Sequence, residues 1–336
     1  MTIRDTGDSS CAPTLLADDQ LPRASAAARL SQIVPRRVLR PLVGRLPFNA
    51  AGLRLLRMMT DAPARLARPV PGTLIDAVQQ PGLRGEWVVA PAVRDSGRVI
   101  LYLHGSAFTL MSARTHRPLV SRLSQRTALP CFSVDYRLAP EHPFPAASDD
   151  VMAAYRHLLA QGYRAADIVV AGDSAGGFLA VDLALQLART DEPLPAALAL
   201  FSPLVDLSLQ LAADQERRTP DCLVTAADCR RLVDLYVGSG DRSDPRITMD
   251  FASVQRFPPT LVQAGGNEML QADAQHLHRC IQASGNTSYL QVWPGQMHVF
   301  QNMSALTESA TALRQAALFI DWAMRGSTTS ERKCIG

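Results

Sequence analysis

A serine set between glycines is the first feature of this 336-residue chain that predicts chemistry. G-D-S-A-G-G, residues 172–177, follows the apolar run D-I-V-V-A and precedes F-L-A-V-D-L-A-L-Q-L-A-R, which has helical spacing. Glycines two positions before and after the serine allow a strand to turn sharply into a helix and lift the hydroxyl out of the sheet. We therefore predict that Ser174 is a nucleophile, and that the first amides of the helix face any anion formed there. The alternative is a serine that only forms a turn.

A serine hydroxyl needs a general base, and three histidines follow Ser174 in the chain. His276 and His278 lie in Q-A-D-A-Q-H-L-H-R-C, a helical pattern in which surface or half-buried positions are expected. His298 lies in G-Q-M-H-V-F, a few residues after the last apolar strand pattern. In the strand-turn-helix serine hydrolases the histidine comes last in the chain, so we predict that His298 is the base.

The base needs a carboxylate, and three acidic residues are candidates. Glu268 lies three residues beyond Gly265 in T-L-V-Q-A-G-G-N-E-M-L-Q-A-D, where a loop at the end of a strand would present it. Asp273 falls within the helix expected next, and Asp206 follows another strand pattern in F-S-P-L-V-D-L. We favour Glu268 and leave Asp206 and Asp273 open.

Three small residues follow a third apolar run, in L-Y-L-H-G-S-A-F at residues 101–108. Attack on an acyl carbon creates an oxyanion that main-chain N–H groups must stabilise, and small residues let a substrate oxygen approach the backbone. One donor is expected from the residue after the nucleophile, Ala175, and the others from this loop. The predicted oxyanion donors are therefore the amides of Gly105, Ser106 and Ala175.

Two regimes in the sequence indicate how these residues are positioned. Residues 25–71 are rich in arginine, with leucines at helical spacing and interrupting prolines, which predicts short amphipathic helices. From Gly72 onward, short apolar runs alternate with helical patterns, which is typical of a mainly parallel, doubly wound sheet. Eight strands are expected, at residues 73–78, 86–91, 98–104, 131–136, 167–172, 197–203, 260–265 and 289–295.

Composition excludes several classes of protein. The net charge of +3 comes from 34 basic and 31 acidic residues, a balance that gives no support to nucleic-acid binding. No apolar run reaches the length of a transmembrane helix, and the polar start M-T-I-R-D-T-G-D-S-S does not look like a secretory signal, so a cytoplasmic location is expected. The scattered cysteines, at positions 11, 131, 222, 229, 280 and 334, are expected to be free thiols.

Five motifs in order resemble the hormone-sensitive-lipase family of α/β hydrolases, in particular its bacterial esterase branch. They are H-G-S-A-F (104–108), D-Y-R-L-A-P-E-H-P-F-P-A-A (135–147), G-D-S-A-G-G (172–177), N-E-M-L-Q-A-D (267–273) and G-Q-M-H-V-F (295–300). The resemblance covers about residues 73–323. It implies an α/β-hydrolase fold with an eight-stranded, mostly parallel sheet flanked by helices. It also implies an N-terminal helical cap and a cofactor-independent carboxylesterase that acts on short- to medium-chain acyl esters without a metal.

The resemblance also suggests bounds for the parts of the chain. A flexible N-terminus is expected over 1–24, the helical cap over 25–71, the catalytic core over 72–325 with a cap insertion near 207–245, and a flexible tail over 326–336. Arg137 and Glu141, in the second motif, are expected to form structural ion pairs rather than to act in catalysis.

The sequence departs from the family pattern in the oxyanion loop. The family has H-G-G-G, and this chain has Ser106 and Ala107 in place of the second and third glycines. Their side chains narrow the approach to the backbone, and either residue would be strained at positive φ.

Three further possibilities stay open from the sequence. The altered loop is compatible with a non-catalytic small-molecule receptor of the same fold. The arginine-rich stretch 35–68 could dock on anionic membranes, as in a membrane-surface lipase, although a cap that packs its leucines on the core is favoured. A homodimer formed through the eighth strand is a further expectation.

Overall fold

The computed structural model describes residues 12–45, 49–91, 93–94 and 97–332, and its centre is one eight-stranded sheet. The strand order is β1-β2-β4-β3-β5-β6-β7-β8. β2 pairs antiparallel with β1 and β4, and all other neighbours are parallel, so the predicted fold is confirmed. The strands are β1 Leu74–Gln80, β2 Leu83–Val89, β3 Val99–Leu103, β4 Cys131–Val134, β5 Ile168–Asp173, β6 Ala197–Phe201, β7 Thr260–Gly265 and β8 Ser288–Trp293.

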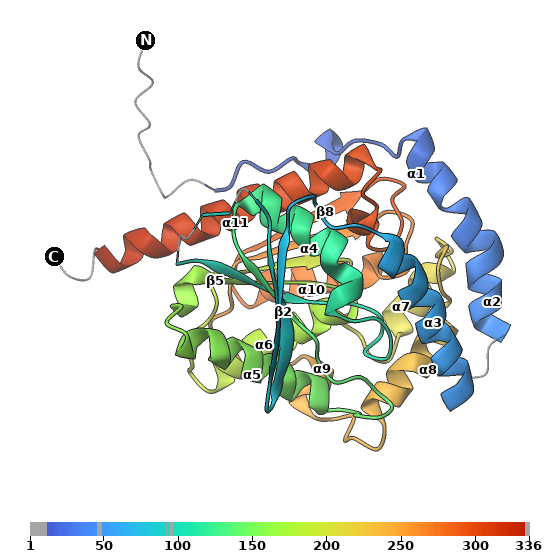
Figure 1. Cartoon of the computed structure of the whole chain (residues 1–336), viewed down its shortest axis with the longest axis horizontal. Helices are drawn as coiled ribbons and strands as arrows, with labels where there is room; N and C mark the ends of the chain where they lie inside the picture. The colour runs from blue at the N-terminus through green and yellow to red at the C-terminus, as the bar shows by residue number, and fades with distance from the viewer. Residues whose placement is uncertain (1–11, 46–48, 92, 95–96, 333–336) are drawn as a thin grey trace, which may run out of the picture.

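Helices cover both faces of the sheet (Figure 1). α4 (Ala113–Thr127) and α11 (Thr307–Arg332) pack on one face, and α5 (Ala146–Ala160), α6 (Ala175–Arg189) and α10 (Gln271–Ala283) pack on the other. Side chains of a strand alternate between faces, so Ile100 and Tyr102 join the first core and Leu101 and Leu103 join the second. β3 is buried on both sides, which explains its continuous apolar sequence.

A helical segment before the sheet forms one edge of the molecule (Figure 1). It consists of α1 (Ala26–Ser31), a π-helical turn η2 (Pro35–Leu39), α2 (Arg40–Arg45) and α3 (Ala50–Leu66). Beside it lie α7 (Gln210–Glu216) and α8 (Ala226–Val237), which come from the chain between β6 and β7. The shorter elements are η1 (Asp18–Gln20), η3 (Ala165–Asp167), α9 (Pro245–Thr248) and η4 (Phe300–Asn302).

The leucines of this segment pack differently from the sequence expectation. Leu53 and Leu56 of α3 are buried against the core, as predicted. Leu30, Val34 and Val38 instead have 63%, 66% and 58% of their surface exposed. Ala28, Gln32 and Arg40 lie on the inner face of this part of the chain instead. The prediction that the cap packs its leucines on the core is therefore confirmed for Leu53 and Leu56 of α3 and wrong for Leu30 of α1.

The ranges suggested for the parts of the chain stay predictions. The helices above fall within 25–71 and 207–245. α11 continues to Arg332, so the suggested flexible tail overlaps a helix, and residues 1–11 and 333–336 lie outside the described residues. Among the residues described, no helix is both long and apolar enough to span a bilayer. Four cysteines, Cys131, Cys222, Cys229 and Cys280, are free thiols, whereas positions 11 and 334 are not described.

Gly176, at the start of α6, lets this helix lie close against β3 of the sheet. A Cβ on Gly176 would lie 2.0 Å from the carbonyl oxygen of Leu103. We expect Gly176→Ala to lower the free energy of unfolding by about 3 kcal/mol or more, because backbone at both sides must shift. Urea denaturation measures this.

Gly44→Ala, in α2, is the matched control, because the new Cβ would lie 3.4 Å from Asp228 Oδ2 of α8, which is ordinary van der Waals contact. Alanine favours helix over glycine, so this variant is expected to be neutral or slightly stabilised. Equal urea midpoints for the two variants would contradict the close-packing argument.

Candidate active site

Ser174 lies at the turn between β5 and α6 with φ of 52° and ψ of −118°. A non-glycine residue in this region is strained and needs neighbours to hold it there. Its N–H donates to the Phe201 carbonyl at 2.9 Å, and its own carbonyl accepts from the amides of Phe178 and Leu204 at 3.2 and 3.0 Å. Ser174 is partly exposed although both of its neighbours are buried. The turn therefore presents this one residue at the edge of the sheet.

Glu268 and His298 meet beyond the ends of two neighbouring parallel strands. Glu268 follows β7, His298 follows β8, and a Glu268 Oε2 to His298 Nδ1 hydrogen bond joins them. The carboxylate is fully buried, and its other oxygen accepts hydrogen bonds from Ser202 Oγ at 2.7 Å and from the Gly265 amide at 2.6 Å. Ser202 Oγ also accepts from the Val299 amide at 3.1 Å, so one hydroxyl ties the two loops together.

The two other candidate acids are engaged elsewhere. Asp273 accepts the amides of Val205 and Asp206, each at 2.9 Å. Burial raises the pKa of Asp273 to about 7 despite these bonds. Asp206 in turn accepts the amides that follow it, including that of Ser208 at 2.8 Å. Of the three acids considered, Glu268 is the one that contacts His298.

Electrostatics at His298 favour its charged form. Burial lowers the pKa of His298, but the charge of Glu268 and their hydrogen bond outweigh burial, and the net shift is upward. Asp221 contributes to the same upward shift. This buried carboxylate accepts the amides of Leu223 at 2.7 Å and Met269 at 3.2 Å. The sequence did not predict Asp221, because nothing in its local pattern places it beside Glu268 or Met269, which are 47 and 48 positions away.

The oxyanion loop has an unusual backbone for its residues. Ser106, Ala107 and Phe108 have φ of 90°, 50° and 60°. This is the region where glycine is favoured, and each L-residue there costs roughly 1 kcal/mol. Hydrogen bonds hold the loop in place: Tyr136 Oη donates to the His104 carbonyl at 2.7 Å, and the Ala139 amide donates to the Phe108 carbonyl at 3.0 Å. The strain anticipated at the two substituted glycine positions is present.

Three N–H groups at this site are available as donors. Within the described part of the chain, the amides of Ser106, Ala107 and Ala175 have no acceptor. The amide of Gly105 donates to Asp173 Oδ1 at 3.2 Å. Ser106 and Ala175 were expected donors, Ala107 was not considered, and Gly105 is occupied in this structure.

Comparison with known proteins shows which protein family this chain resembles. The family described as alpha/beta hydrolase fold matches residues 100–302. "Carboxylesterase/phospholipase LipF" of Mycobacterium tuberculosis is 36% identical over 322 residues, which cover 91% of this chain and 84% of that protein. An "Acetyl-hydrolase" of Streptomyces hygroscopicus is 37% identical over 236 residues, which cover 70% of this chain and 78% of that protein. The crystal structure of an esterase from the bacterial hormone-sensitive lipase family superposes with a TM-score of 0.80 at 32% identity, covering 88% of this chain and 98% of that one.

The chain belongs to the hormone-sensitive-lipase family of α/β hydrolases. One of its departures from the family motifs lies in the oxyanion loop, where Ser106 and Ala107 adopt positive φ. Among the residues described for this hydrolase, no group of three or more His, Cys, Asp or Glu side chains is arranged to hold a metal ion.

A buried charged network lies beneath the oxyanion loop of this hydrolase. The Asp173 carboxylate accepts from Tyr102 Oη at 2.8 Å and faces His116 Nε2 at 3.4 Å. Burial raises the pKa of Asp173, but the charge and hydrogen bond of His116 outweigh it and lower the pKa. Burial lowers the pKa of His104 to about 3, which keeps this ring neutral where it stacks on Tyr136 at 4.2 Å. The carboxylate adjacent to Ser174 therefore fixes the Gly105 peptide of the oxyanion loop.

Arg57 of α3 ties the cap to the same loop. Its Nε donates to the carbonyl of Thr109, and Nη2 donates to that of Ala139, both at 2.9 Å. Nη1 and Nη2 also form a bidentate pair with Glu141 at 2.8 Å. Glu141 thus has a structural ion pair, as expected, and Arg137 pairs separately with Asp150 at 2.7 Å.

α1 contacts the other half of the site. Gln32 Nε2 donates to the carbonyl of Gly295 at 2.8 Å, and Gln32 Oε1 accepts from Asn267 Nδ2 at 3.4 Å. Gly295 precedes His298 by three residues, and Asn267 is adjacent to Glu268. The cap therefore contacts both the loops that carry Glu268 and His298 and the oxyanion loop.

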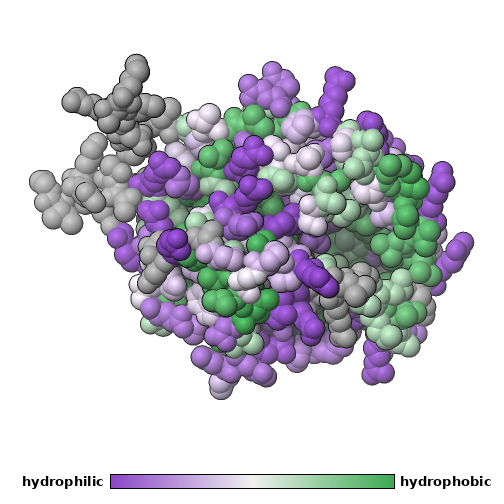
Figure 2. Space-filling model, turned by 45° about the horizontal axis from the view of Figure 1, so that its top comes forward, coloured by the Kyte–Doolittle hydropathy of each residue, from purple (hydrophilic) through white to green (hydrophobic). Residues whose placement is uncertain are grey.

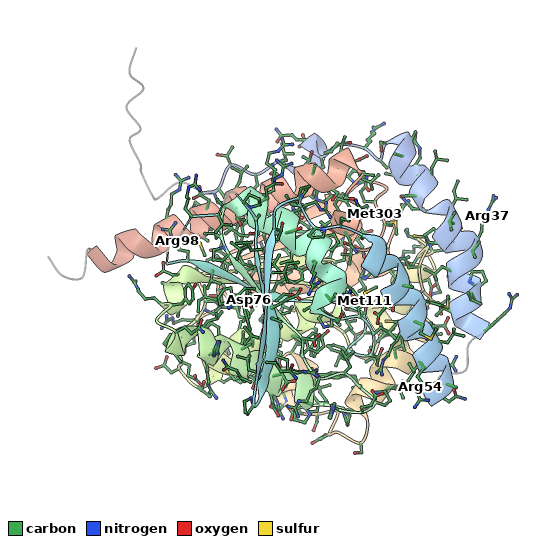
Figure 3. All side chains as sticks on the ribbon, in the orientation of Figure 1. Arg37, Arg54, Asp76, Arg98, Met111 and Met303 are labelled. Atoms are coloured by element: carbon green, nitrogen blue, oxygen red, sulfur yellow. The ribbon has the colours of Figure 1, made fainter. Side chains whose placement is uncertain are left out.

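We expect Arg57→Lys to lower kcat for a nitrophenyl ester about tenfold with a smaller change in KM. The ammonium group of lysine cannot replace the planar guanidinium of Arg57, which donates to two carbonyls and a carboxylate at the same time. Arg54→Lys is the matched control, because Arg54 is exposed on the same helix (Figure 3). Equal kcat values for the two variants would show that the contacts of Arg57 do not position the oxyanion loop.

Proposed function

We propose that this serine carboxylic-ester hydrolase acts on short- to medium-chain acyl esters through Ser174, His298 and Glu268. The observation that carries the proposal is the hydrogen bond between the buried Glu268 carboxylate and His298 Nδ1, in loops that lie at the same sheet edge as the Ser174 turn. The bond leaves Nε2 of the ring for proton transfer. No organic cofactor enters the proposed reaction.

In the first step, Ser174 Oγ attacks the ester carbonyl carbon while His298 Nε2 takes the hydroxyl proton. The charge of Glu268 stabilises the imidazolium that forms. The carbonyl oxygen becomes an oxyanion, and the unoccupied amides of Ser106, Ala107 and Ala175 are the proposed donors to it. The intermediate collapses when the ester C–O bond breaks, and His298 gives its proton to the leaving alcohol.

In the second step, water hydrolyses the acyl-enzyme through the same groups. His298 takes a proton from the attacking water, the same amides bind the second oxyanion, and the carboxylic acid leaves as the proton returns to Ser174 Oγ. Each donor of this kind contributes roughly 3 kcal/mol to the transition state. The strained loop supports the proposal because its main chain is held in place before substrate arrives.

The acyl preference is inferred from the apolar residues next to the oxyanion loop. One apolar cluster surrounds Ala107 of this loop. It contains Leu53 and Leu56 of the cap, Leu110 after the loop, and Leu232 of α8. An acyl chain whose carbonyl oxygen lies at the loop would meet this cluster at once, and the printed name of the Streptomyces relative, an acetyl-hydrolase, is consistent with short chains. A cytoplasmic location and a homodimer remain predictions from the sequence, with β8 at the edge of the sheet.

Ser174→Ala is expected to reduce kcat on nitrophenyl acetate and butyrate by at least about 10⁴-fold, since the nucleophile of the acyl-enzyme is removed. Ser112→Ala, a helix N-cap outside the proposed site, is the control and is expected to keep most of its activity. Activity that survives in a folded Ser174→Ala protein would exclude the proposed mechanism.

The pH dependence tests the role of Glu268. His298 must be neutral to accept a proton, and its pKa lies above the ordinary 6.5, so kcat/KM is expected to fall with decreasing pH, with a midpoint above about 6.5. Glu268→Gln removes the charge that raises this pKa and leaves the burial that lowers it. We expect this variant to have a lower kcat and a midpoint moved to lower pH by about one unit or more.

Asp273→Asn is the control for this profile, because Asp273 contacts main-chain amides and not His298. Its midpoint is expected to match that of the unaltered enzyme. A midpoint that moves in Asp273→Asn and stays in place in Glu268→Gln would assign the acid to Asp273 instead.

A further inference from the structure

An apolar stripe runs along the outer face of the first helices. Leu30, Val34, Val38 and Leu42 follow one another at intervals of four residues and are exposed by 63%, 66%, 58% and 39%, and Ile33 beside them is exposed by 40%. Helical residues four apart share a face, so these side chains form one continuous strip across α1, η2 and α2. We call these five residues the α1–α2 stripe. The space-filling view shows hydrophobic side chains gathered along an edge of the molecule with hydrophilic ones projecting among them (Figure 2).

The orientation of these helices is fixed by contacts on their opposite face. Ala28 is buried, Gln32 bonds to the carbonyl of Gly295, and Arg40 pairs with Glu216 of α7. These three residues fix the inner side of the helical segment against the rest of the molecule. Rotation that would bury the stripe would break both polar contacts, so its exposure is a property of the fold.

The charge around the stripe has one sign. From residue 20 to residue 60 the chain contains eight arginines and no aspartate or glutamate, whereas the whole chain has a net charge of only +3. Arg29, Arg36, Arg37 and Arg45 are exposed, and among the residues described none of them contacts a carboxylate. Arg37 projects outward from this edge (Figure 3).

We propose that the α1–α2 stripe and its arginines dock the enzyme on an anionic lipid surface. An amphipathic helix that lies on a membrane buries its apolar face at the boundary between headgroups and acyl chains while flanking cations contact anionic headgroups. The stripe supplies the apolar face, and the four exposed arginines supply the cations.

A second copy of the chain fits this surface less well. A two-fold dimer places the same patch on both partners, so it would bring the exposed arginines of one copy against those of the other. Burial of the stripe would then be opposed by like charges, whereas an anionic lipid surface offers the opposite charge.

Docking by this face would bring lipid close to the proposed catalytic residues. Gln32, on the inner side of the same helical segment, contacts the loops that carry Glu268 and His298. The enzyme would then meet acyl esters held in a membrane. The binding step itself is independent of catalysis, so Ser174→Ala protein can be used to measure it, and a failure of the proposed triad would leave the result intact.

The test is co-sedimentation of the full chain, as Ser174→Ala protein, with vesicles of phosphatidylcholine alone or with 30% phosphatidylglycerol. Two further variants are compared with it in the same background. Arg36→Gln/Arg37→Gln removes cations, and Val34→Ser/Val38→Ser removes apolar surface. Their controls are Arg126→Gln/Arg314→Gln, which changes net charge equally with exposed arginines of α4 and α11, and Leu318→Ser, an exposed apolar residue of α11.

We expect binding to the phosphatidylglycerol vesicles at low salt, weaker binding at high salt and little binding to phosphatidylcholine alone. The arginine variant is expected to bind roughly 30-fold more weakly, and the valine variant about tenfold more weakly, while both controls keep the binding of the parent protein. Circular dichroism confirms that each variant is folded.

Three results would overturn the proposal. The first is the absence of co-sedimentation with phosphatidylglycerol vesicles at low salt. The second is equal binding by both stripe variants and their controls. The third is self-association in sedimentation velocity that Val34→Ser/Val38→Ser abolishes, without vesicle binding by the parent protein, which would make the stripe a surface between copies of this chain.

Discussion

The reversal from β5 into α6 at Ser174 constrains the rest of the site. The chain makes this turn in one residue, with φ of 52° and ψ of −118°. Directly after it, α6 approaches β3 so closely that a Cβ on Gly176 would lie 2.0 Å from the Leu103 carbonyl oxygen. The same approach brings the amide of Ala175 and the carboxylate of Asp173 beside the loop that follows β3. Ser174 and the proposed oxyanion donors are therefore positioned by one packing contact.

The cap supports the site from outside the sheet. Arg57 of α3 bonds to the carbonyls of Thr109 and Ala139, and Gln32, directly after α1, bonds to the loops of Glu268 and His298. These contacts couple the position of the cap to both halves of the proposed machinery. A surface that binds α1 would therefore also affect, through Gln32, the position of the loops that carry Glu268 and His298.

Local patterns in the sequence were sufficient for the sheet and for the loops of the proposed site. All eight strands form where short apolar runs predict them, and Glu268 and His298 meet because parallel strands end at one edge of a sheet. Contacts between distant residues had no such signal. Arg57 and Glu141 are 84 positions apart, and the pairing of His116 with Asp173 depends on how α4 lies across the sheet. The burial of Leu30 was wrongly predicted, because a leucine-rich helical pattern indicates an apolar face without indicating whether the core or another surface covers it.

Covalent labelling measures directly whether Ser174 is the activated serine of this hydrolase, as we propose. The enzyme is treated with one equivalent of a nitrophenyl alkylphosphonate, digested with trypsin and examined by mass spectrometry. We predict a single phosphonyl adduct, on the peptide 165–189 at Ser174, with loss of activity in proportion to labelling. An adduct on Ser106 or Ser202, or inactivation without any adduct on peptide 165–189, would contradict it.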